Sequence, residues 1–322
     1  MTVRPSVMIV AEPGDTHALV VLERLRSLGA ADSFIWDSSR FPAMDSFSFS
    51  LAKRTLSAEL DSSSVGRISM GDLNGVWLRR LRAGAIPAQV ASEPARAFCR
   101  QEAYEAFTGA LVASGIPLYN PPMAEMLAER KAYQLCIARK AGLRIPRTLV
   151  SNNPERVRDF AKSCRESIIC KPLSPTVGLS ASTRLLMKEE LKDLAVLKNA
   201  PAMFQEYLPP KEDLRVTVVG RETFSARSNS SHLDWRTDAS VRWQSTSLPR
   251  QIANSMRKTM RLLGLSMGSF DLRIDEQGRP VFLEINPNGQ FLFLEVANPD
   301  LQISAAIARL LLSSERQGRS AS

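Results

Sequence analysis

Strand-like and helix-like spacings of apolar residues alternate over the first 120 positions of the chain. A short apolar run at 7–11 predicts a strand, and apolar positions at helical spacing over 18–28 predict a helix that ends at Gly29. A long helix is predicted over 93–114. Four more segments are predicted to be strands, at 33–36, 47–51, 55–60 and 75–78. This order predicts an α/β domain, and no glycine fingerprint for a dinucleotide follows the first strand.

The prolines of Asn120-Pro121-Pro122 interrupt this pattern, and the next region begins with a helix predicted over 124–140. Gly142 and then Pro146 end that helix. The remaining predictions are a strand at 167–171, a Gly/Ser-rich loop at 174–180, a helix at 188–197, an apolar stretch at 203–208, strands at 214–219 and 223–228 around a Gly220-Arg221 turn, and helices at 255–263 and 301–312.

Two alternating strands flank a turn between residues 269 and 286, and oxygen-bearing side chains share one of their faces. If Gln277 and Gly278 form the turn centre, Asp271 lies directly opposite Glu284, with Asn286 on the same face. Opposed carboxylates destabilise a sheet unless a cation neutralises them, and Mg²⁺ beside phosphates prefers such oxygen ligands. The alternative is an ordinary solvated hairpin face, and a change of register would separate the pair.

Two lysines occupy positions at which a phosphate would be a suitable partner. Lys171 ends an apolar strand, where an unpaired ammonium is costly to bury, so it either binds an anion or reaches solvent at the strand end. Lys131 lies early in the helix predicted over 124–140. From the residues alone, Lys131 is an ordinary surface lysine.

The composition narrows the range of chemistry. A chain of 322 residues with 44% hydrophobic residues predicts two or three packed subdomains, and the absence of a long apolar run or a charged leader predicts a cytoplasmic protein. The net charge of +9 attracts anions and leaves nucleic acid, nucleotide and acidic peptide open as partners. With two histidines and four separated cysteines, a His-based metal site, a Ser-His-Asp triad or a disulfide framework is not expected.

Several motifs resemble those of one enzyme family. The segments 270–272 and 282–290 look like the metal-binding end of ATP-grasp enzymes, where an acid on one strand and Glu-x-Asn on the next hold magnesium. The sequence Asn-Pro-Asn-Gly-Gln at 286–290 is most similar to the peptide-macrocyclising members, the graspetide (microviridin-type) ligases. The segments 77–80, 120–121 and 234–236 resemble the same ligases, so that the similarity covers nearly the whole chain.

The resemblance implies a role for each candidate residue. It implies that Lys131 and Lys171 contact the phosphates of ATP, with the loop at 174–180 as a mobile cover. It implies that 204–208 is the hinge against adenine, with backbone groups of Glu206 and Leu208 on the adenine edge, and that Arg215 stabilises the transferring phosphoryl group or an acyl phosphate. The resemblance further implies that Asp213 binds the ribose hydroxyls. The implied catalytic residues are Arg215 and Lys171, and the implied Mg²⁺ ligands are Asp271, Glu284 and Asn286. The implied nucleotide-binding residues are Lys131, Lys171, Gln205, Glu206, Tyr207, Leu208 and Asp213.

The implied fold is ATP-grasp, of the α/β class. An N-terminal α/β (pre-ATP-grasp) domain is expected at 1–120, a central lobe at 121–203, a C-terminal lobe with the metal site at 204–313, and a flexible tail at 314–322. Related enzymes are often dimers, which implies a homodimer.

The implied activity is ATP-dependent ligation within a ribosomally made precursor peptide. An Asp or Glu side chain of the peptide is phosphorylated to an acyl phosphate, and a Ser or Thr hydroxyl or a Lys amine of the same peptide then attacks, giving a macrolactone or macrolactam. Part of the precursor's leader is expected near 228–243. One alternative is a ligase that adds amino acids to a protein or small acid, like glutathione synthetase or ribosomal-protein-modifying enzymes. Another is a basic nucleic-acid-binding protein without turnover, which has no need of clustered acids.

Overall fold

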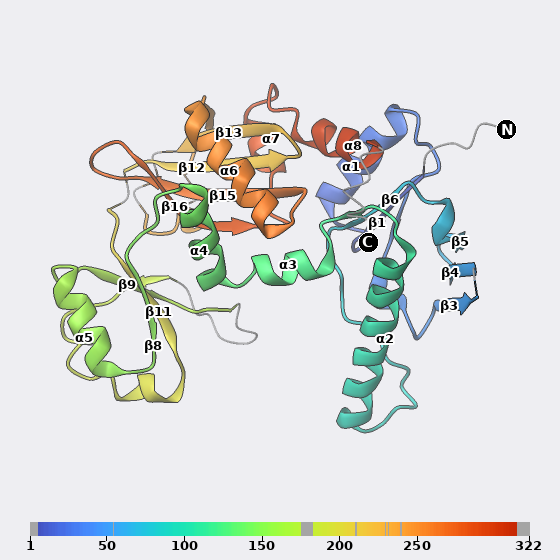
Figure 1. Cartoon of the computed structure of the whole chain (residues 1–322), viewed down its shortest axis with the longest axis horizontal. Coiled ribbons are helices and arrows are strands. Elements are labelled where there is room, and N and C mark those ends of the chain that lie inside the picture. The colour runs from blue at the N-terminus through green and yellow to red at the C-terminus, as the bar shows by residue number, and fades with distance from the viewer. Residues whose placement is uncertain are drawn as a thin grey trace.

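The structure, a computed structural model, describes residues 6–53, 55–174, 183–209, 211–228, 230, 232–238 and 240–313, which form four β-sheets (Figure 1). The first sheet is parallel, in the order β2-β1-β6-β7. Its strands are β1 (Val7–Val10), β2 (Phe34–Trp36), β6 (Gly75–Leu78) and β7 (Leu118–Tyr119). An antiparallel meander of β3 (Ser46–Ala52), β4 (Thr55–Ser62) and β5 (Gly66–Ser69) packs beside it. These strands confirm the predicted α/β start of the chain.

Two helices flank the first sheet. The Asp15 carboxylate accepts from the Ala18 N–H and so begins α1 (Thr16–Ser27), while α2 (Glu93–Ser114) begins at Ser92 and ends at Gly115 in a left-handed conformation. Both helices were predicted, and the bounds of α2 are the predicted ones. Among the described residues, no helix combines the length and the apolar character needed to cross a membrane.

The helix predicted over 124–140 is wrong as a single element, because the chain forms α3 (Pro122–Ala128) and α4 (Lys131–Ala141). Arg130 is extended, and the Gln134 side chain donates to the Ala128 carbonyl that a continuous helix would have used. The same amide pairs with both backbone groups of Ile285 in β16, with N···O distances of 2.9 and 3.1 Å. This break makes Lys131 the first residue of α4 and anchors it beside the C-terminal sheet.

The central sheet is antiparallel, in the order β10-β9-β11-β8. It contains β8 (Thr148–Ser151), β9 (Ile168–Lys171), β10 (Arg184–Leu185) and β11 (Ala202–Glu206), with α5 (Pro154–Ser163) packed on it. The helix predicted at 188–197 is wrong. The carboxylates of Glu190 and Asp193 bond the N–H groups of Met187 and Ala195, and only a 3-10 turn forms at Ala195–Asn199. The predicted cover at 174–180 lies, apart from Ser174, outside the described residues.

The C-terminal sheet is antiparallel, in the order β14-β13-β12-β15-β16. It contains β12 (Asp213–Val219), β13 (Glu222–Ser228), β14 (Gln244–Ser245), β15 (Met267–Ile274) and β16 (Pro280–Asn286). Helices α4 and α6 (Arg250–Leu263) bury one face with apolar residues such as Met256 and Phe270. The chain continues through α7 (Leu292–Ala297) to α8 (Ile303–Leu312), which packs against α1.

The pairing of β15 with β16 confirms the predicted juxtaposition of Asp271 and Glu284. The assumed turn was wrong, because residues 275–279 form a longer loop in which the Asp275 side chain accepts the N–H groups of Gln277 and Arg279. The register next to this loop would place Asp271 opposite Leu283. A β-bulge between Asp271 and Leu272 shifts the ladder by one residue, which returns Glu284 to its position opposite Asp271.

Candidate active site

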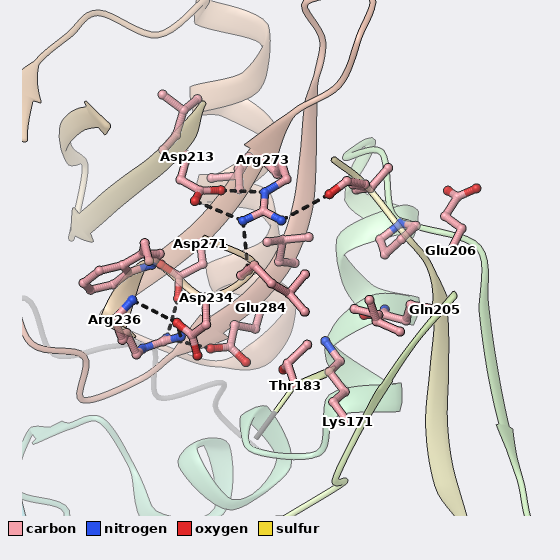
Figure 2. A pocket seen from close by; sticks show the side chains of 18 of the residues that line it. Lys171, Thr183, Gln205, Glu206, Asp213, Asp234, Arg236, Asp271, Arg273 and Glu284 are labelled. Carbon is pink, nitrogen blue, oxygen red and sulfur yellow. Dashed lines mark hydrogen bonds and ion pairs between the residues drawn. The ribbon is translucent and has the colours of Figure 1, made fainter. Parts of the chain in front are cut away.

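A pocket lies where strands of the central and C-terminal sheets meet α4 (Figure 2). Eight of the predicted site residues line it: Lys131, Lys171, Gln205, Glu206, Leu208, Asp213, Asp271 and Glu284. A cavity of about 790 Å³ adjoins this pocket, and Arg215 and Asn286 line it together with Lys131 and Glu284. Tyr207 lines neither of them, and its N–H donates to the Ser167 carbonyl at 3.0 Å. The structure therefore gathers the predicted residues, Tyr207 excepted, around one continuous space.

Lys171 ends β9 with its side chain directed into the pocket (Figure 2). It is 8% exposed, and among the described residues its ammonium has neither an ion pair nor a hydrogen bond. Burial lowers the pKa of Lys171 to about 8, although Glu284 opposes this shift. A buried, unpaired ammonium facing a pocket is the state that an anionic ligand would relieve.

Lys131 approaches the same space from the first turn of α4. Its Nζ donates to the Pro172 carbonyl at 2.8 Å, which directs the ammonium toward the end of β9 and away from bulk solvent. Burial lowers the pKa of Lys131, and Glu284 partly compensates for that shift. Two cations on different elements therefore face one pocket, a pairing that repels unless an anion lies between them.

The predicted hinge at 204–208 comprises the end of β11 and the two residues after it, at the edge of the pocket. The Gln205 side chain is buried and donates to Thr148 Oγ1 at 2.9 Å, while the Glu206 carboxylate accepts the Arg147 N–H at 3.0 Å. The Leu208 carbonyl accepts from Arg273 at 3.2 Å. These hydrogen bonds fix the position of residues 205–208 at the border of the pocket.

Asp213 forms a buried ion pair that the sequence interpretation missed. Arg273 Nε and Nη2 donate to its two carboxylate oxygens at 2.8 and 3.0 Å, and both residues are at most 4% exposed. Burial raises the pKa of Asp213 despite the guanidinium. Alternation along β15 places Arg273 on the same face as Asp271, which was the available signal. Its partner follows only from the β12–β15 register.

Asp271 lies in the sheet between two arginines. Arg215, its cross-strand neighbour on β12, donates through Nη1 to both carboxylate oxygens at 2.9 and 2.8 Å. Arg236 Nη2 reaches Asp271 Oδ2 and Glu284 Oε1, each at 3.0 Å (Figure 2). Burial raises the pKa of Asp271 against the effect of both arginines. For Glu284, burial acts in the same direction, but Arg236, Lys171 and Lys131 together bring its pKa below the usual value.

Arg236 is the second residue whose place the sequence did not reveal, because the segment 234–236 was given no role in the site. It is the middle residue of a 3-10 turn (Trp235–Thr237) in the segment after β13. Its guanidinium stacks on the Trp235 ring, 5.0 Å from the ring centroid, and pairs with Asp234 at 3.2 Å. Its guanidinium thereby spans the two carboxylates from β15 and β16. No local pattern predicts that a loop residue folds back onto these strands.

The oxygen-rich group fits a divalent cation that is shared with a ligand. Asn286 lies 3.4 Å from both carboxylates, measured from its Nδ2 to Asp271 Oδ2 and Glu284 Oε1, and the Arg236 guanidinium shows that a positive charge is accommodated between them. Within the described ranges, no three His, Cys, Asp or Glu residues gather into a metal site of their own. Asp271, Glu284 and Asn286 would therefore hold Mg²⁺ only together with oxygens of a bound phosphate ligand.

Residues next to β1 and β6 of the first sheet hold the loop that follows Asn286. The Arg79 guanidinium donates to the Asn288 carbonyl and pairs with Asp15 at 3.3 Å, while Asn288 Nδ2 donates to the Leu78 carbonyl at 3.0 Å. His17 Nε2 accepts the N–H of Phe291 at 3.2 Å, and burial lowers the pKa of His17 to about 4, so the ring is neutral at pH 7. The resemblance at 77–80 thus corresponds to a support beneath the loop at 286–292.

Gly289 allows this loop to approach Arg215. A Cβ at this position would lie 2.6 Å from Ser269 Cβ and 2.7 Å from Arg215 Nη2. We expect Gly289→Ala to lower the free energy of unfolding by about 1–3 kcal/mol and to displace the guanidinium, because both neighbours are buried and cannot withdraw freely. Urea unfolding and product formation would test this. Gly109→Ala, where nothing lies within 4 Å, is the control, and equal stability of the two variants would contradict the expectation.

No family model matches the sequence. Solved structures of ATP-grasp ligases, however, match this chain over almost its whole length. The macrocyclase MdnC from Microcystis aeruginosa MRC, solved with its precursor peptide MdnA, is 30% identical with a TM-score of 0.86, and the match covers 96% of this chain and 99% of MdnC. The ATP-grasp ligase PsnB, solved with a phosphomimetic variant of its minimal precursor, Mg and ADP, is 25% identical with a TM-score of 0.78, covering 96% and 98%. A Chryseobacterium gregarium RiPP-associated ATP-grasp ligase is 23% identical with a TM-score of 0.86, covering 95% and 96%, and supports the fold.

Proposed function

Because the chain belongs to the RiPP-modifying ATP-grasp ligases of the graspetide type, we propose that it uses ATP and Mg²⁺ to close rings in a ribosomally made precursor peptide. The observation that carries this proposal is one space in which two lysines and a carboxylate cluster stand at the entrance of a larger cavity. The positive charge of the lysines suits the phosphates of ATP, and the cavity of about 790 Å³ has room for a segment of peptide. A basic binding surface without turnover would need no such arrangement.

The two lysines and the hinge would position the nucleotide. Lys171 and Lys131 would bind its phosphates, and the ammonium of Lys171 would be fully charged once an anion relieved its burial. Glu206 and Leu208 border the pocket on the side where the base would lie, and Asp213 would accept from the ribose hydroxyls. The pocket walls would exclude water from the phosphoryl group, which favours transfer to a carboxylate over hydrolysis.

Arg215 and the carboxylate cluster would act on the group being transferred. Mg²⁺ held by Asp271, Glu284 and Asn286 would supply charge neutralisation at the phosphoryl oxygens. Asp271 fixes Nη1 of Arg215, and the Gln290 carbonyl fixes Nη2 at 3.1 Å. Arg215 and Gln290 both line the cavity of about 790 Å³. Arg215 would orient the carboxylate of the peptide and then stabilise the acyl phosphate.

The cavity of about 790 Å³ is the proposed site of the peptide. Trp235, Trp243 and Phe293 form an aromatic wall with ring centroids 5.1 to 5.8 Å apart, and Arg80 and Arg242 also line the cavity. An apolar wall with arginines suits a segment that carries acidic side chains. The neighbouring segment at 228–243 is the proposed contact of the leader.

Mass spectrometry would test the proposed function. The protein would be incubated with ATP, Mg²⁺ and a short peptide rich in Asp, Glu, Ser, Thr or Lys that is encoded beside its gene. We expect the peptide to lose the mass of one water per ring, with one ADP released each time, and we expect no loss when a non-hydrolysable ATP analogue replaces ATP. A mass gain by added amino acids would instead indicate the glutathione synthetase-like alternative. Magnesium-independent, salt-sensitive binding of nucleic acid without ADP release would indicate the non-catalytic alternative.

A further inference from the structure

One carboxylate in the peptide cavity takes no part in the mechanism described so far. It belongs to Glu125 on α3, the helix that crosses between the first domain and the C-terminal sheet in Figure 1. We propose that Glu125 is the general base that takes the proton of the acceptor hydroxyl or amine as it attacks the acyl phosphate. This inference rests on the proposed function and names the residue for its second half-reaction.

The position of Glu125 satisfies the first requirement of a base, access to the acceptor. It lines the same cavity as Glu284, Asn286 and Arg236, so Glu125 and the carboxylate cluster both border the space proposed for the peptide. Its Oε1 accepts from Asn288 Nδ2 at 2.5 Å. Within the part of the chain that the structure describes, its Oε2 accepts no hydrogen bond. One oxygen is therefore held, and the other is available to the cavity.

The Asn288 side chain that bonds Glu125 is itself fixed by other contacts. Asn288 Nδ2 also donates to the Leu78 carbonyl at 3.0 Å, and its own carbonyl accepts from the buried Arg79. The Glu125 N–H donates to the Pro121 carbonyl at 3.0 Å, which fixes the first turn of α3. Groups from three parts of the fold thus set the direction of this carboxylate, an arrangement that suits a proton acceptor.

Two other glutamates line the cavity among the described residues, and neither suits the role as well. Glu284 pairs with Arg236 at 3.0 Å and belongs to the cation-binding cluster. Glu129 is exposed at the end of α3 and has no partner that would direct it, as far as the described residues show. Glu125 is the member that is held, partly buried and outside the cation-binding cluster.

The surroundings of Glu125 also suit proton transfer near neutral pH. Burial raises the pKa of Glu125 to about 7, the Asn288 bond opposes the shift, and Glu129 adds to it. A base whose pKa lies near the working pH accepts a proton readily and still exists largely as the carboxylate. The charged or titratable groups around it are Glu129 beyond α3, Arg79 and Arg80 after β6, Tyr104 on α2, and, across the cavity, Lys131, Arg215, Arg236, Arg242 and Glu284.

The step balances without any further reactant. For a hydroxyl acceptor, the O–H proton passes to Glu125 Oε2 while the oxygen forms a bond to the carbonyl carbon of the acyl phosphate. The bond from that carbon to the phosphate oxygen breaks, and inorganic phosphate leaves with the electron pair. For an amine that arrives as ammonium, Glu125 takes one proton before attack, and the departing phosphate takes the second.

Hydroxylamine separates this step from the one before it, because it is a neutral nucleophile that captures an acyl phosphate without a base. We expect Glu125→Gln to form the peptide hydroxamate and ADP at the wild-type rate, whereas ring closure falls by about 10²–10⁴-fold. Ring closure by the wild type should rise with pH through an apparent pKa of about 7, and the variant should lack this limb. Glutamine can still accept from Asn288, so the melting temperature should stay unchanged.

Glu102→Gln, at an exposed position of α2 that lines neither the pocket nor the cavity, is the control, and it should keep both hydroxamate formation and ring closure. Three results would overturn the proposal. They are ring closure by Glu125→Gln within a few-fold of wild type, an equal loss of hydroxamate and rings, or an unchanged pH limb in the variant. If the wild type itself formed no hydroxamate, the proposed function would fail before Glu125 came into question.

Discussion

Glu284→Gln is expected to lower ring formation and peptide-dependent ADP release by about 10³-fold, with a melting temperature close to that of the wild type. The carboxylate stands opposite Asp271 and within 3.0 Å of Arg236, at the point where the phosphates and the proposed Mg²⁺ would meet. Glutamine keeps the shape but removes the charge. Because the Glu284 side chain is 24% exposed and Arg236 keeps its bonds to Asp271 and Asp234, the guanidinium that contacts Glu284 stays paired in the variant.

The measurement combines ADP release, peptide mass and thermal unfolding on one preparation. Glu276→Gln is the control, since Glu276 lies exposed in the loop of the same hairpin. Activity of Glu284→Gln within tenfold of the wild type would remove Glu284 from the site. A large fall in melting temperature would instead show that its role is structural.

Local patterns predicted the parts of the site that neighbouring residues determine. The alternation in β15 and β16 placed Asp271, Glu284 and Asn286 on one face, and the apolar strand before Lys171 identified a lysine that is costly to bury. Even there, the correct pairing of Asp271 came from two compensating errors. The turn was longer than assumed, and a β-bulge, which no residue pattern announced, restored the register.

The rest of the site depends on contacts between distant segments. Arg236 reaches the carboxylates from a loop after β13, and Glu125 meets Asn288 across 163 positions of the chain. The break between α3 and α4 has the same origin, because Gln134 bonds Ile285 of β16 in preference to continuing one helix. The spacing of apolar residues indicates only whether a segment, taken alone, favours a helix. It does not report which distant backbone group competes for a side chain.

Asp271→Ala is expected to differ from Glu284→Gln by destabilising the fold as well as abolishing activity. Arg215 is 3% exposed, and its guanidinium is held by Asp271 and the Gln290 carbonyl, while Nε has no hydrogen-bond partner among the described residues. Removal of the carboxylate leaves a buried cation with one carbonyl partner. That loss costs about 3–5 kcal/mol for a buried ion pair, whereas the half-exposed Arg236 can turn to water.

The double variant Arg215→Leu with Asp271→Leu tests this explanation directly. If the cost of Asp271→Ala arises from the stranded guanidinium, removal of both charges should restore most of the free energy of unfolding in urea, although product formation should stay absent because both groups belong to the site. Stability of Asp271→Ala within about 1 kcal/mol of the wild type would show that Arg215 finds water or another partner. A double variant as unstable as Asp271→Ala would place the cost in packing around β12 and β15, and the buried ion pair would then not be what holds these two strands together.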